Sequence, residues 1–305
     1  MSATIIDGKL ISSQIKEELA QEVAELKAQG ITPGLAVVIV GEDPASQVYV
    51  GQKEKACVAL GVYSEKHTLP ADISQDKLIN LVRDLNNNPK INGILVQLPL
   101  PKHLDETEVL YEISPEKDVD GFHPVSVGKL VIGEAAFLPC TPHGIQELLV
   151  RSGVEVAGKD VVIVGRSNIV GKPMAMILVQ KKEGANATVT ICHTGTKDMT
   201  AHTKRADILI VAAGRPKTVT GDMVKDGAVV IDVGVNRTDQ GLVGDVDFDS
   251  VKEKASAITP VPGGVGPMTI AMLMMNTVEA AKRQASGRSP VQNANCKVKG
   301  GFLKI

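Results

Sequence analysis

Six short runs of aliphatic and β-branched residues recur along the chain, each bounded by glycine or polar residues. They are LAVVIV (35–40), GILVQL (93–98), DVVIVG (160–165), ATVTI (187–191), DILIVAAG (207–214) and AVVIDVG (228–234). A strand that is apolar on both faces must be covered on both faces, which is typical of a parallel sheet between layers of helices. The pattern therefore predicts an α/β fold.

Helical spacing fills the intervals between these runs, in segments that end at glycine or asparagine. The clearest are 10–30, 74–86, 141–153 and 172–184. The length of 305 residues allows two domains. We place their boundary near FLPCTPHG (137–144), and expect the segments 1–142 and 143–267 to form the two domains. We expect 268–284 to form a long helix that packs back on the first domain, and 286–305 to be an appendage outside the cores.

Composition excludes several classes of partner. Lys and Arg total 33 against 35 Asp and Glu, a formal charge of −2, and only three Tyr and four Phe are present. A chain without a basic surface or stacking aromatics is not expected to bind nucleic acid or an anionic membrane. The four cysteines show no zinc-binding spacing, which predicts no metal site and a reducing compartment. A small molecule is the expected partner.

The amino-terminal sequence MSATIIDGKL lacks the apolar run of a signal peptide, and the first arginine is Arg83, which argues against an arginine-rich transit peptide. No run of about 18 apolar residues is present, so no membrane span is expected. We therefore expect a cytoplasmic protein.

The stretch VYVGQKEKAC (48–57) places a phenol and an amine one helical turn apart. Asp43 and Pro44 suit the start of a helix, and Gly61 suits its end. Tyr49 and Lys53, four residues apart, share one face of this helix. One interpretation is a surface lysine beside a half-buried tyrosine. The other is a site in which both groups reach one ligand, and the motif by itself leaves both open.

Further polar residues fall where strands end, which is where open α/β sheets bind ligands. Gln97 interrupts the apolar run GILVQL and is followed by PLP, and a polar group there needs a partner or a purpose. Asp118 and Asp120 lie in the turn-rich segment KDVDGFHP. We expect these side chains and Lys53 to cluster at one edge of the first sheet.

The second domain begins with a dinucleotide-binding pattern, VVIVGRSNIVGKPM (161–174). Gly165 and Gly171 stand where such a turn needs glycine, whereas Ser167 replaces the middle glycine. The motif follows a strand and opens a helix, whose free amides can bind phosphate.

The end of the next strand carries Cys192, His193 and Thr194 instead of the acidic residue that usually binds the ribose of NAD. Arg166, His193 and Thr194 would suit the additional phosphate of NADP, although His193 could also be a strand-end residue without a ligand. The loop ITPVPGGVGPMT (258–269) is stiff at its prolines and lacks side chains at its glycines, so its backbone could approach a flat ligand or simply form a rigid turn.

Together these motifs resemble the bifunctional methylenetetrahydrofolate dehydrogenase/cyclohydrolases. The resemblance runs from about residue 5 to residue 283 and rests on motifs that occur in the family's order. They are GEDPASQVYVGQKEKAC, GILVQLPLP, KDVDGFHP, PCTPHGI, VVIVGRSNIVGKPM, VIDVGVN, VGDVDF and ITPVPGGVGPMT.

The resemblance implies a folate-binding catalytic domain, a Rossmann-like domain that binds NADP rather than NAD, a cleft between them, and a homodimer. It implies oxidation of 5,10-methylene-tetrahydrofolate followed by hydrolysis of the methenyl product to 10-formyl-tetrahydrofolate. The catalytic and substrate-binding residues that it implies are Tyr49, Lys53, Gln97, Leu98, Pro99, Asp120, Gly263, Gly264 and Pro267. The cofactor-binding residues that it implies are Gly165, Arg166, Ser167, His193, Thr194 and Val235.

Two other functions compete with this interpretation. An amino-acid or hydroxy-acid dehydrogenase would need a carboxylate-binding arginine in the cleft, and Arg83, in the middle of the helical segment LVRDLN, is the only arginine before residue 150. An NADP-binding sensor would not need Lys53, Gln97 and Asp120 at one sheet edge. In the second domain, the segment QKKEGANATVT (180–190) is longer than a minimal connection, and a surface loop would tolerate that length.

Overall fold

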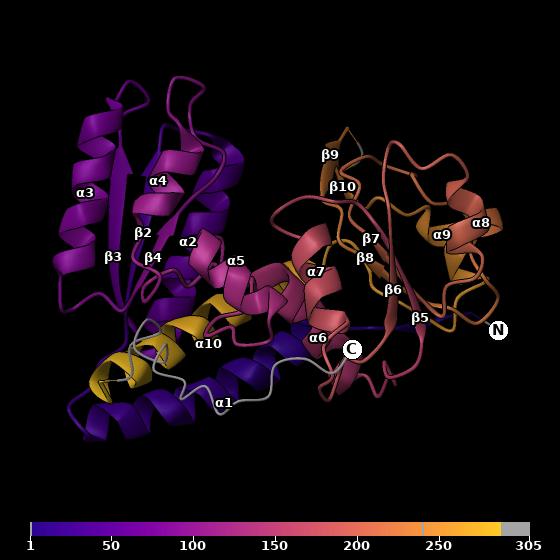
Figure 1. Ribbon diagram of the computed structural model, residues 1–305, viewed down its shortest axis with the longest axis horizontal. Helices are drawn as coiled ribbons and strands as arrows, with labels where there is room; N and C mark the ends of the chain where they lie inside the picture. Colours follow the sequence, from indigo (N-terminus) through magenta and orange to yellow (C-terminus); the bar gives the residue numbers. More distant parts are fainter. Residues whose placement is uncertain (1, 240, 288–305) are drawn as a thin grey trace, which may run out of the picture.

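The computed structural model describes residues 2–239 and 241–287. Two α/β domains stand side by side, and the long helices α1 (Gly8–Ala28) and α10 (Val265–Ala285) run beneath the first of them (Figure 1). The predicted two-domain α/β class is confirmed.

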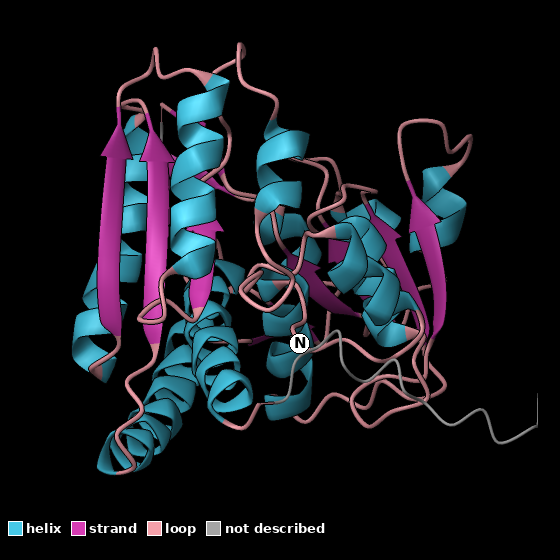
Figure 2. Cartoon of the chain, turned by 60° about the vertical axis from the view of Figure 1, so that its left-hand side comes forward, coloured by secondary structure: helices cyan, strands magenta, loops and turns pink. Residues whose placement is uncertain are grey.

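The first domain is built on a small parallel sheet. In the described residues its strand order is β3 (Tyr63–Leu69), β2 (Gly34–Val40), β4 (Gly93–Val96), and every residue of β2 is buried. The strands point the same way between covering helices (Figure 2). The helices that contact this sheet are α2 (Pro44–Leu60), α3 (Gln75–Asn87) and α10, whereas α4 (Glu106–Glu112) packs on α3 and α5 (Pro124–Val131) packs on α7 (Gly171–Leu178). The carboxyl ends of β2 and β4 therefore open at one edge, next to α2.

The second domain contains a larger parallel sheet. Its order in the described part of the chain is β1-β11-β8-β7-β5-β6. The strands are β1 (Thr4–Ile5), β5 (Asp160–Val164), β6 (Thr188–Cys192), β7 (Ile208–Val211), β8 (Val229–Asp232) and β11 (Ala257–Ile258), with a separate hairpin of β9 (Asn236–Thr238) and β10 (Gly241–Val243). The helices here are α7 (Gly171–Leu178), α8 (Met199–Thr203), α9 (Phe248–Lys252) and a 3-10 turn, η1 (Gly221–Met223).

Helix α6 (Cys140–Arg151) lies between the two domains and packs on α10, with Gly144 against Met268. A hydrogen bond of 3.0 Å joins the Thr141 and Thr269 hydroxyls of these two helices. Helix α10 also packs on α1 and α2. One hydrophobic core consequently runs from the helices of the first domain into the second sheet.

The structure differs from the sequence-based expectations in several places. Strand β4 ends at Val96, so Gln97 lies just beyond the strand rather than inside it. The segment 1–142 was assigned to the first domain, yet Thr4 and Ile5 pair with β11 in the second sheet. A strand of two residues is too short to leave a readable pattern. Helix α10 begins at Val265, three residues before the predicted start. Of the predicted tail 286–305, the part after Gly287 lies outside the described residues.

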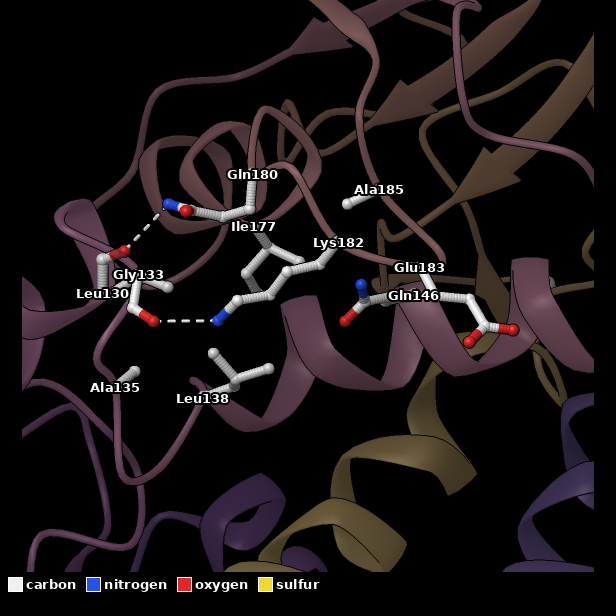
Figure 3. A pocket seen from close by; sticks show the side chains of 10 residues that line it. All are labelled: Leu130, Gly133, Ala135, Leu138, Gln146, Ile177, Gln180, Lys182, Glu183 and Ala185. Carbon is white, nitrogen blue, oxygen red and sulfur yellow. Dashed lines mark hydrogen bonds between the residues drawn. The ribbon is translucent and has the colours of Figure 1, made fainter.

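The segment 180–190 is more than a surface loop. Gln180 donates hydrogen bonds to the carbonyl oxygens of Leu130 (3.1 Å) and Met176 (3.1 Å), and the Lys182 amine donates to the Gly133 carbonyl oxygen at 2.8 Å. These bonds border a cavity of about 250 Å³ between α5, α6 and α7 (Figure 3). The long connection therefore ties α7 to the chain that follows α5.

Candidate active site

Lys53 lies in the third turn of α2, and its position follows from the ends of that helix. The Asp43 carboxylate accepts a hydrogen bond from the Ser46 amide at 2.8 Å, Pro44 opens the helix, and Gly61, with φ of 70°, closes it. These start and stop residues are those that the sequence predicted. Between them Lys53 faces inward and is 8% exposed.

A glutamine holds the buried amine. The Lys53 Nζ donates to Gln97 Oε1 at 2.9 Å, and Gln97 Nε2 donates to the Leu98 carbonyl oxygen at 2.8 Å. The peptide bond between Leu98 and Pro99 is cis. Helix α2 and the end of β4 thus present one amine at the edge where the strands end.

Asp120 and Cys140 complete what we call the Lys53 cluster, namely Lys53, Gln97, Asp120 and Cys140. The Asp120 carboxylate attracts the Lys53 ammonium and is hydrogen-bonded to the Cys140 thiol. Burial lowers the pKa of Lys53, while the Asp120 charge opposes this change. Burial also raises the pKa of Asp120 and that of Cys140. All three groups are therefore drawn toward their neutral forms.

Asn276 on α10 fixes the segment that carries Asp120. Its Nδ2 donates to the carbonyl oxygens of Val119 at 2.7 Å and Leu138 at 2.9 Å. Asp118 braces the same segment, since its carboxylate accepts from the His123 amide at 2.9 Å and from the Ser126 hydroxyl at 2.7 Å.

Cys140 and Asn276 were absent from the sequence-based site. The motif PCTPHGI did contain Cys140, but its proximity to Asp120 depends on how the domains fold. Asp118 was noted in the sequence, and the structure gives it a bracing position beneath the loop.

Tyr49 takes no part in these hydrogen bonds. It lies one turn before Lys53 on α2 and is 38% exposed.

The proline-glycine loop (258–269) also lies apart from these hydrogen bonds. Gly263 and Gly264 precede α10, and a side chain at Gly8 of α1 would overlap the Gly264 carbonyl oxygen. The Ser12 hydroxyl donates to the Pro267 carbonyl oxygen at 3.1 Å. The loop is thus clamped between α1 and α10.

The predicted cofactor residues lie at the carboxyl ends of β5, β6 and β8. Gly165 follows β5 with φ of 134°, and a Cβ there would overlap the Ala212 carbonyl oxygen, so only glycine fits. The Ser167 oxygen accepts from the Val170 amide at 3.1 Å, which shapes the turn before α7. Its hydroxyl hydrogen remains able to donate to a phosphate.

Arg166, Thr194 and Val235 are exposed at the same edge. His193 Nδ1 accepts from the Gly195 amide at 3.0 Å, so in a neutral ring the hydrogen lies on Nε2 and can be donated. No acidic residue follows β6 directly. This arrangement, with a glycine turn, a helix amino terminus and an exposed arginine, fits a dinucleotide with an additional phosphate.

Two features outside the site bear on other functions. Arg83 pairs with Glu112 at 3.0 Å on the surface, so it is no substrate-binding arginine. Among residues 2–239 and 241–287, no group of three or more His, Cys, Asp or Glu could hold a metal ion, and no helix is long and apolar enough to cross a membrane.

Comparison with known proteins identifies the family. Residues 6–120 match the model of the tetrahydrofolate dehydrogenase/cyclohydrolase catalytic domain, and residues 139–285 match that of the family's NAD(P)-binding domain. The chain belongs to this family.

Members of the tetrahydrofolate dehydrogenase/cyclohydrolase family match the chain over nearly their whole length. The chain is 61% identical to the bifunctional protein FolD of Syntrophus aciditrophicus over 291 residues, which are 93% of this chain and 99% of that protein. It is 60% identical to the bifunctional protein FolD of Moorella thermoacetica, over 93% of this chain and 100% of that protein.

Solved structures of the family agree. The bifunctional FolD enzyme of Campylobacter jejuni superposes with a TM-score of 0.89 at 51% identity, over 93% of this chain and 100% of that one. The Trypanosoma brucei dehydrogenase-cyclohydrolase, solved with NADP and an inhibitor, has a TM-score of 0.88 at 43% identity, over 93% of this chain and 99% of that one.

Proposed function

We propose that the Lys53 cluster is the place where both reactions of the family occur. As a family member, the chain oxidises 5,10-methylene-tetrahydrofolate with NADP and hydrolyses the 5,10-methenyl product to 10-formyl-tetrahydrofolate, within one-carbon metabolism. The observation that carries the placement is the buried Lys53 amine, held 2.9 Å from Gln97 at the carboxyl edge of the first sheet.

The oxidation needs positioning more than a strong base. When bound, NADP accepts the hydride that leaves the methylene carbon. The cation that remains is delocalised over two nitrogens, so the task of the protein is to fix the orientation of the folate. Asp120 would accept hydrogen bonds from the pterin amino and ring N–H groups. Tyr49, exposed on the same face of α2 as Lys53, would pack on the folate and offer its hydroxyl.

The hydrolysis needs proton transfer. Water attacks the methenyl carbon and loses a proton, and a ring nitrogen gains one when the ring opens. Lys53 would move these protons, because burial lowers its pKa and an adjacent methenyl cation would lower it further. Gln97 would hold the amine in the required position.

The remaining predicted contacts surround the folate and the cofactor. Leu98, Pro99, Gly263, Gly264 and Pro267 would form the walls against the folate. The phosphates would meet the amides at the start of α7, and the additional phosphate of NADP would meet Arg166. The other cofactor contacts that we propose are those of Gly165, Ser167, His193, Thr194 and Val235.

We also propose a homodimer, through the free edge of the first sheet. In the described residues β3 pairs only with β2, so its outer backbone groups are open to a second copy. Val58 at the end of α2 is 74% exposed, and Tyr63 at the start of β3 is 40% exposed. Sedimentation should give twice the monomer mass, and Val58→Asp should shift the equilibrium toward the monomer. A wild-type monomer at micromolar concentration would contradict this proposal.

The domain boundary, the cellular location and the absence of a nucleic-acid partner belong to the same proposal. The division near residue 142 is supported by α6, which begins at Cys140 and leads to β5. A cytoplasmic location is supported by Cys57, Cys140 and Cys192, which are free thiols. The formal charge of −2 supports a function without nucleic acid.

One assay tests the central proposal. Purified protein is mixed with methylene-tetrahydrofolate and NADP, and the absorbance of NADPH and of the methenyl product is followed together. We expect NADPH to form and the methenyl species to pass through a maximum before it is hydrolysed. The placement is tested by Gln97→Ala, which should slow both steps, with Gln29→Ala at the exposed carboxyl end of α1 as the control. Equal rates for these two variants would refute the placement at Lys53.

A further inference from the structure

Two carboxylates are buried in the second domain, and backbone amides rather than cations satisfy most of their bonds. Asp232, the last residue of β8, is 3% exposed, and Asp245, which follows β10, is 0% exposed. We call them the carboxylate pair. Burying charge is costly unless every lone pair is satisfied, so their hydrogen bonds show what they hold in place.

Asp232 joins the end of β8 to the segment after the hairpin. Its carboxylate accepts from the amides of Gly234 at 3.0 Å, Asp245 at 2.9 Å and Val246 at 3.0 Å. It therefore fixes the backbone of Asp245 and determines where the second carboxylate points.

Asp245 in turn holds the bend that follows β7. Its Oδ2 accepts from the amides of Ala213 at 2.6 Å and Gly214 at 2.8 Å, and its Oδ1 accepts from Asn236 Nδ2 at 2.8 Å. One side chain thus connects the bend after β7 to the hairpin.

Glycines make room for the carboxylate pair. A Cβ at Gly234 would overlap the Asp245 carboxylate, and a Cβ at Gly244 would overlap the Asp232 carboxylate. The motif VIDVGVN thus supplies Asp232 and the glycine that makes room for Asp245. The motif VGDVDF supplies Asp245 and the glycine that makes room for Asp232. Both motifs are far from the Lys53 cluster in sequence.

The bend held by Asp245 touches the cofactor turn. A Cβ at Gly165 would overlap the Ala212 carbonyl oxygen, so the bend and the glycine turn after β5 lie in direct contact. The Ala212 amide also donates to the Val164 carbonyl oxygen at 2.8 Å. Movement of the bend would therefore disturb the turn at which the dinucleotide binds.

We propose that Asp245, oriented by Asp232, is a positioning residue for the dehydrogenase reaction alone. It holds the bend 212–214 against Gly165 and so keeps the cofactor site formed before NADP arrives. The inference rests on the proposed function, in that NADP binds at this edge. The hydrolysis uses no cofactor, so it does not depend on this bend.

The two activities of the chain provide an internal control. Asp245→Ala should raise the Kd for NADP, measured by calorimetry, and the KM for NADP about 10-fold or more, whereas kcat at saturating NADP falls much less. Hydrolysis of added methenyl-tetrahydrofolate without NADP should stay within about twofold of wild type. Asp249→Asn, an exposed carboxylate on α9 of the same domain, should leave every parameter unchanged.

A milder variant guards against misfolding. Asn236→Ala removes the hydrogen bond to Asp245 at 2.8 Å, together with the longer bonds to the Val243 and Gly244 carbonyl oxygens, and leaves both carboxylates. It should therefore raise the Kd for NADP less than Asp245→Ala does, again without loss of hydrolysis. Unchanged NADP binding in both variants, or an equal loss of hydrolysis, would overturn the positioning role. Wild-type protein that hydrolyses methenyl-tetrahydrofolate but does not bind NADP would refute the proposed function itself, and this inference with it.

Discussion

At the scale of single residues, two opposing effects set the protonation of Lys53. Burial disfavours the charged amine, and the Asp120 carboxylate favours it. Burial is the larger effect, so the pKa of Lys53 lies below its ordinary value. A lysine of this kind has a larger neutral fraction near pH 7 than an exposed one, and it can accept and return a proton.

Removing the amine should separate the two reactions. Lys53→Met keeps the length and the apolar stem, and we expect hydrolysis to fall by at least about 100-fold, the low end for a lost acid–base group. Some oxidation should remain, because hydride transfer depends on orientation, and methenyl-tetrahydrofolate should accumulate in the cuvette. If the variant hydrolysed added methenyl-tetrahydrofolate at the wild-type rate, Lys53 would have no role in proton transfer.

Removing the Asp120 charge should affect both reactions and shift a pH profile. Asp120→Asn should lower both activities together, since both use the same bound pterin. It also removes the attraction that raises the pKa of Lys53. The neutral amine exists above that pKa, so the rise of the residual hydrolysis rate should move to lower pH. Loss of one activity only, or a rise that moves to higher pH, would contradict the assignment.

Arg166 should determine the choice of cofactor. Its exposed guanidinium lies in the turn between β5 and α7. Arg166→Ala should weaken NADP binding by roughly 1 to 3 kcal/mol, as for a lost charge-assisted hydrogen bond, and leave NAD nearly unaffected. Calorimetric titrations with both cofactors test this, and an equal loss for both would exclude a phosphate contact.

At the scale of helices and strands, the sequence predicted the elements that carry strong local signals. Strand β2 is apolar throughout, and helix α2 has its Asp43 cap and Gly61 stop, so both follow from the chain alone. Strand β3, with the sequence YSEKHTL, was missed because an edge strand is mostly exposed and reads as polar. Strand β1 was missed because its partner, β11, lies more than 250 residues away.

The contacts of the site likewise divide into those that the sequence could predict and those that it could not. The proximity of Lys53 to Gln97 could be expected from the shared edge of parallel strands. The bonds from Asn276 to the Asp120 segment could not, because they depend on how α10 returns across the first domain.

Asn276 provides a test of that long-range support. Asn276→Ala removes the amide donor from the buried Val119 carbonyl oxygen, which keeps only a weak bond from the Cys140 thiol at 3.4 Å, and from the half-buried Leu138 carbonyl oxygen. A lost donor of this kind costs about 1 to 3 kcal/mol. We expect denaturant unfolding to show that loss of stability, and both activities to fall because Asp120 follows Val119. Glu279→Ala, at a half-buried (i, i+4) ion pair on the same helix, should change stability by about 0.5 kcal/mol or less. Equal effects of the two substitutions would remove the supporting role of Asn276.

At the scale of the whole molecule, the two domains differ in what fixes their ligand edges. In the first, Gln97 at the end of β4 holds the Lys53 amine of α2, and Asn276 of α10 holds the segment that carries Asp120. In the second, the carboxylate pair accepts hydrogen bonds from the backbone amides of residues 213, 214, 234, 245 and 246. Sequence patterns reveal strands and turns, but a carboxylate that bonds amides 31 and 32 positions away leaves no periodic signal, so this network could not be predicted.

Asp232 should make the stability of the protein depend on pH. Burial raises the pKa of Asp232 from its ordinary 3.8 to about 6 in the folded state. A raised folded pKa means that the stabilising contribution is complete below about pH 4 and is lost as the pH rises through about 6. At about 1.4 kcal/mol per pKa unit, the rise of the pKa from 3.8 to about 6 makes the complete loss about 3 kcal/mol.

Asp232→Asn removes this titration while keeping the shape of the side chain. Denaturant unfolding of wild type and variant at pH 5 and pH 7.5 isolates the Asp232 contribution, because all other titrating groups are shared by the two proteins. We expect the stability of the wild type relative to Asp232→Asn to be lower at pH 7.5 than at pH 5. NADP should oppose the loss in the wild type, since a ligand that binds only the folded state stabilises it. A constant difference between the two proteins at both pH values would show that Asp232 does not titrate in this range.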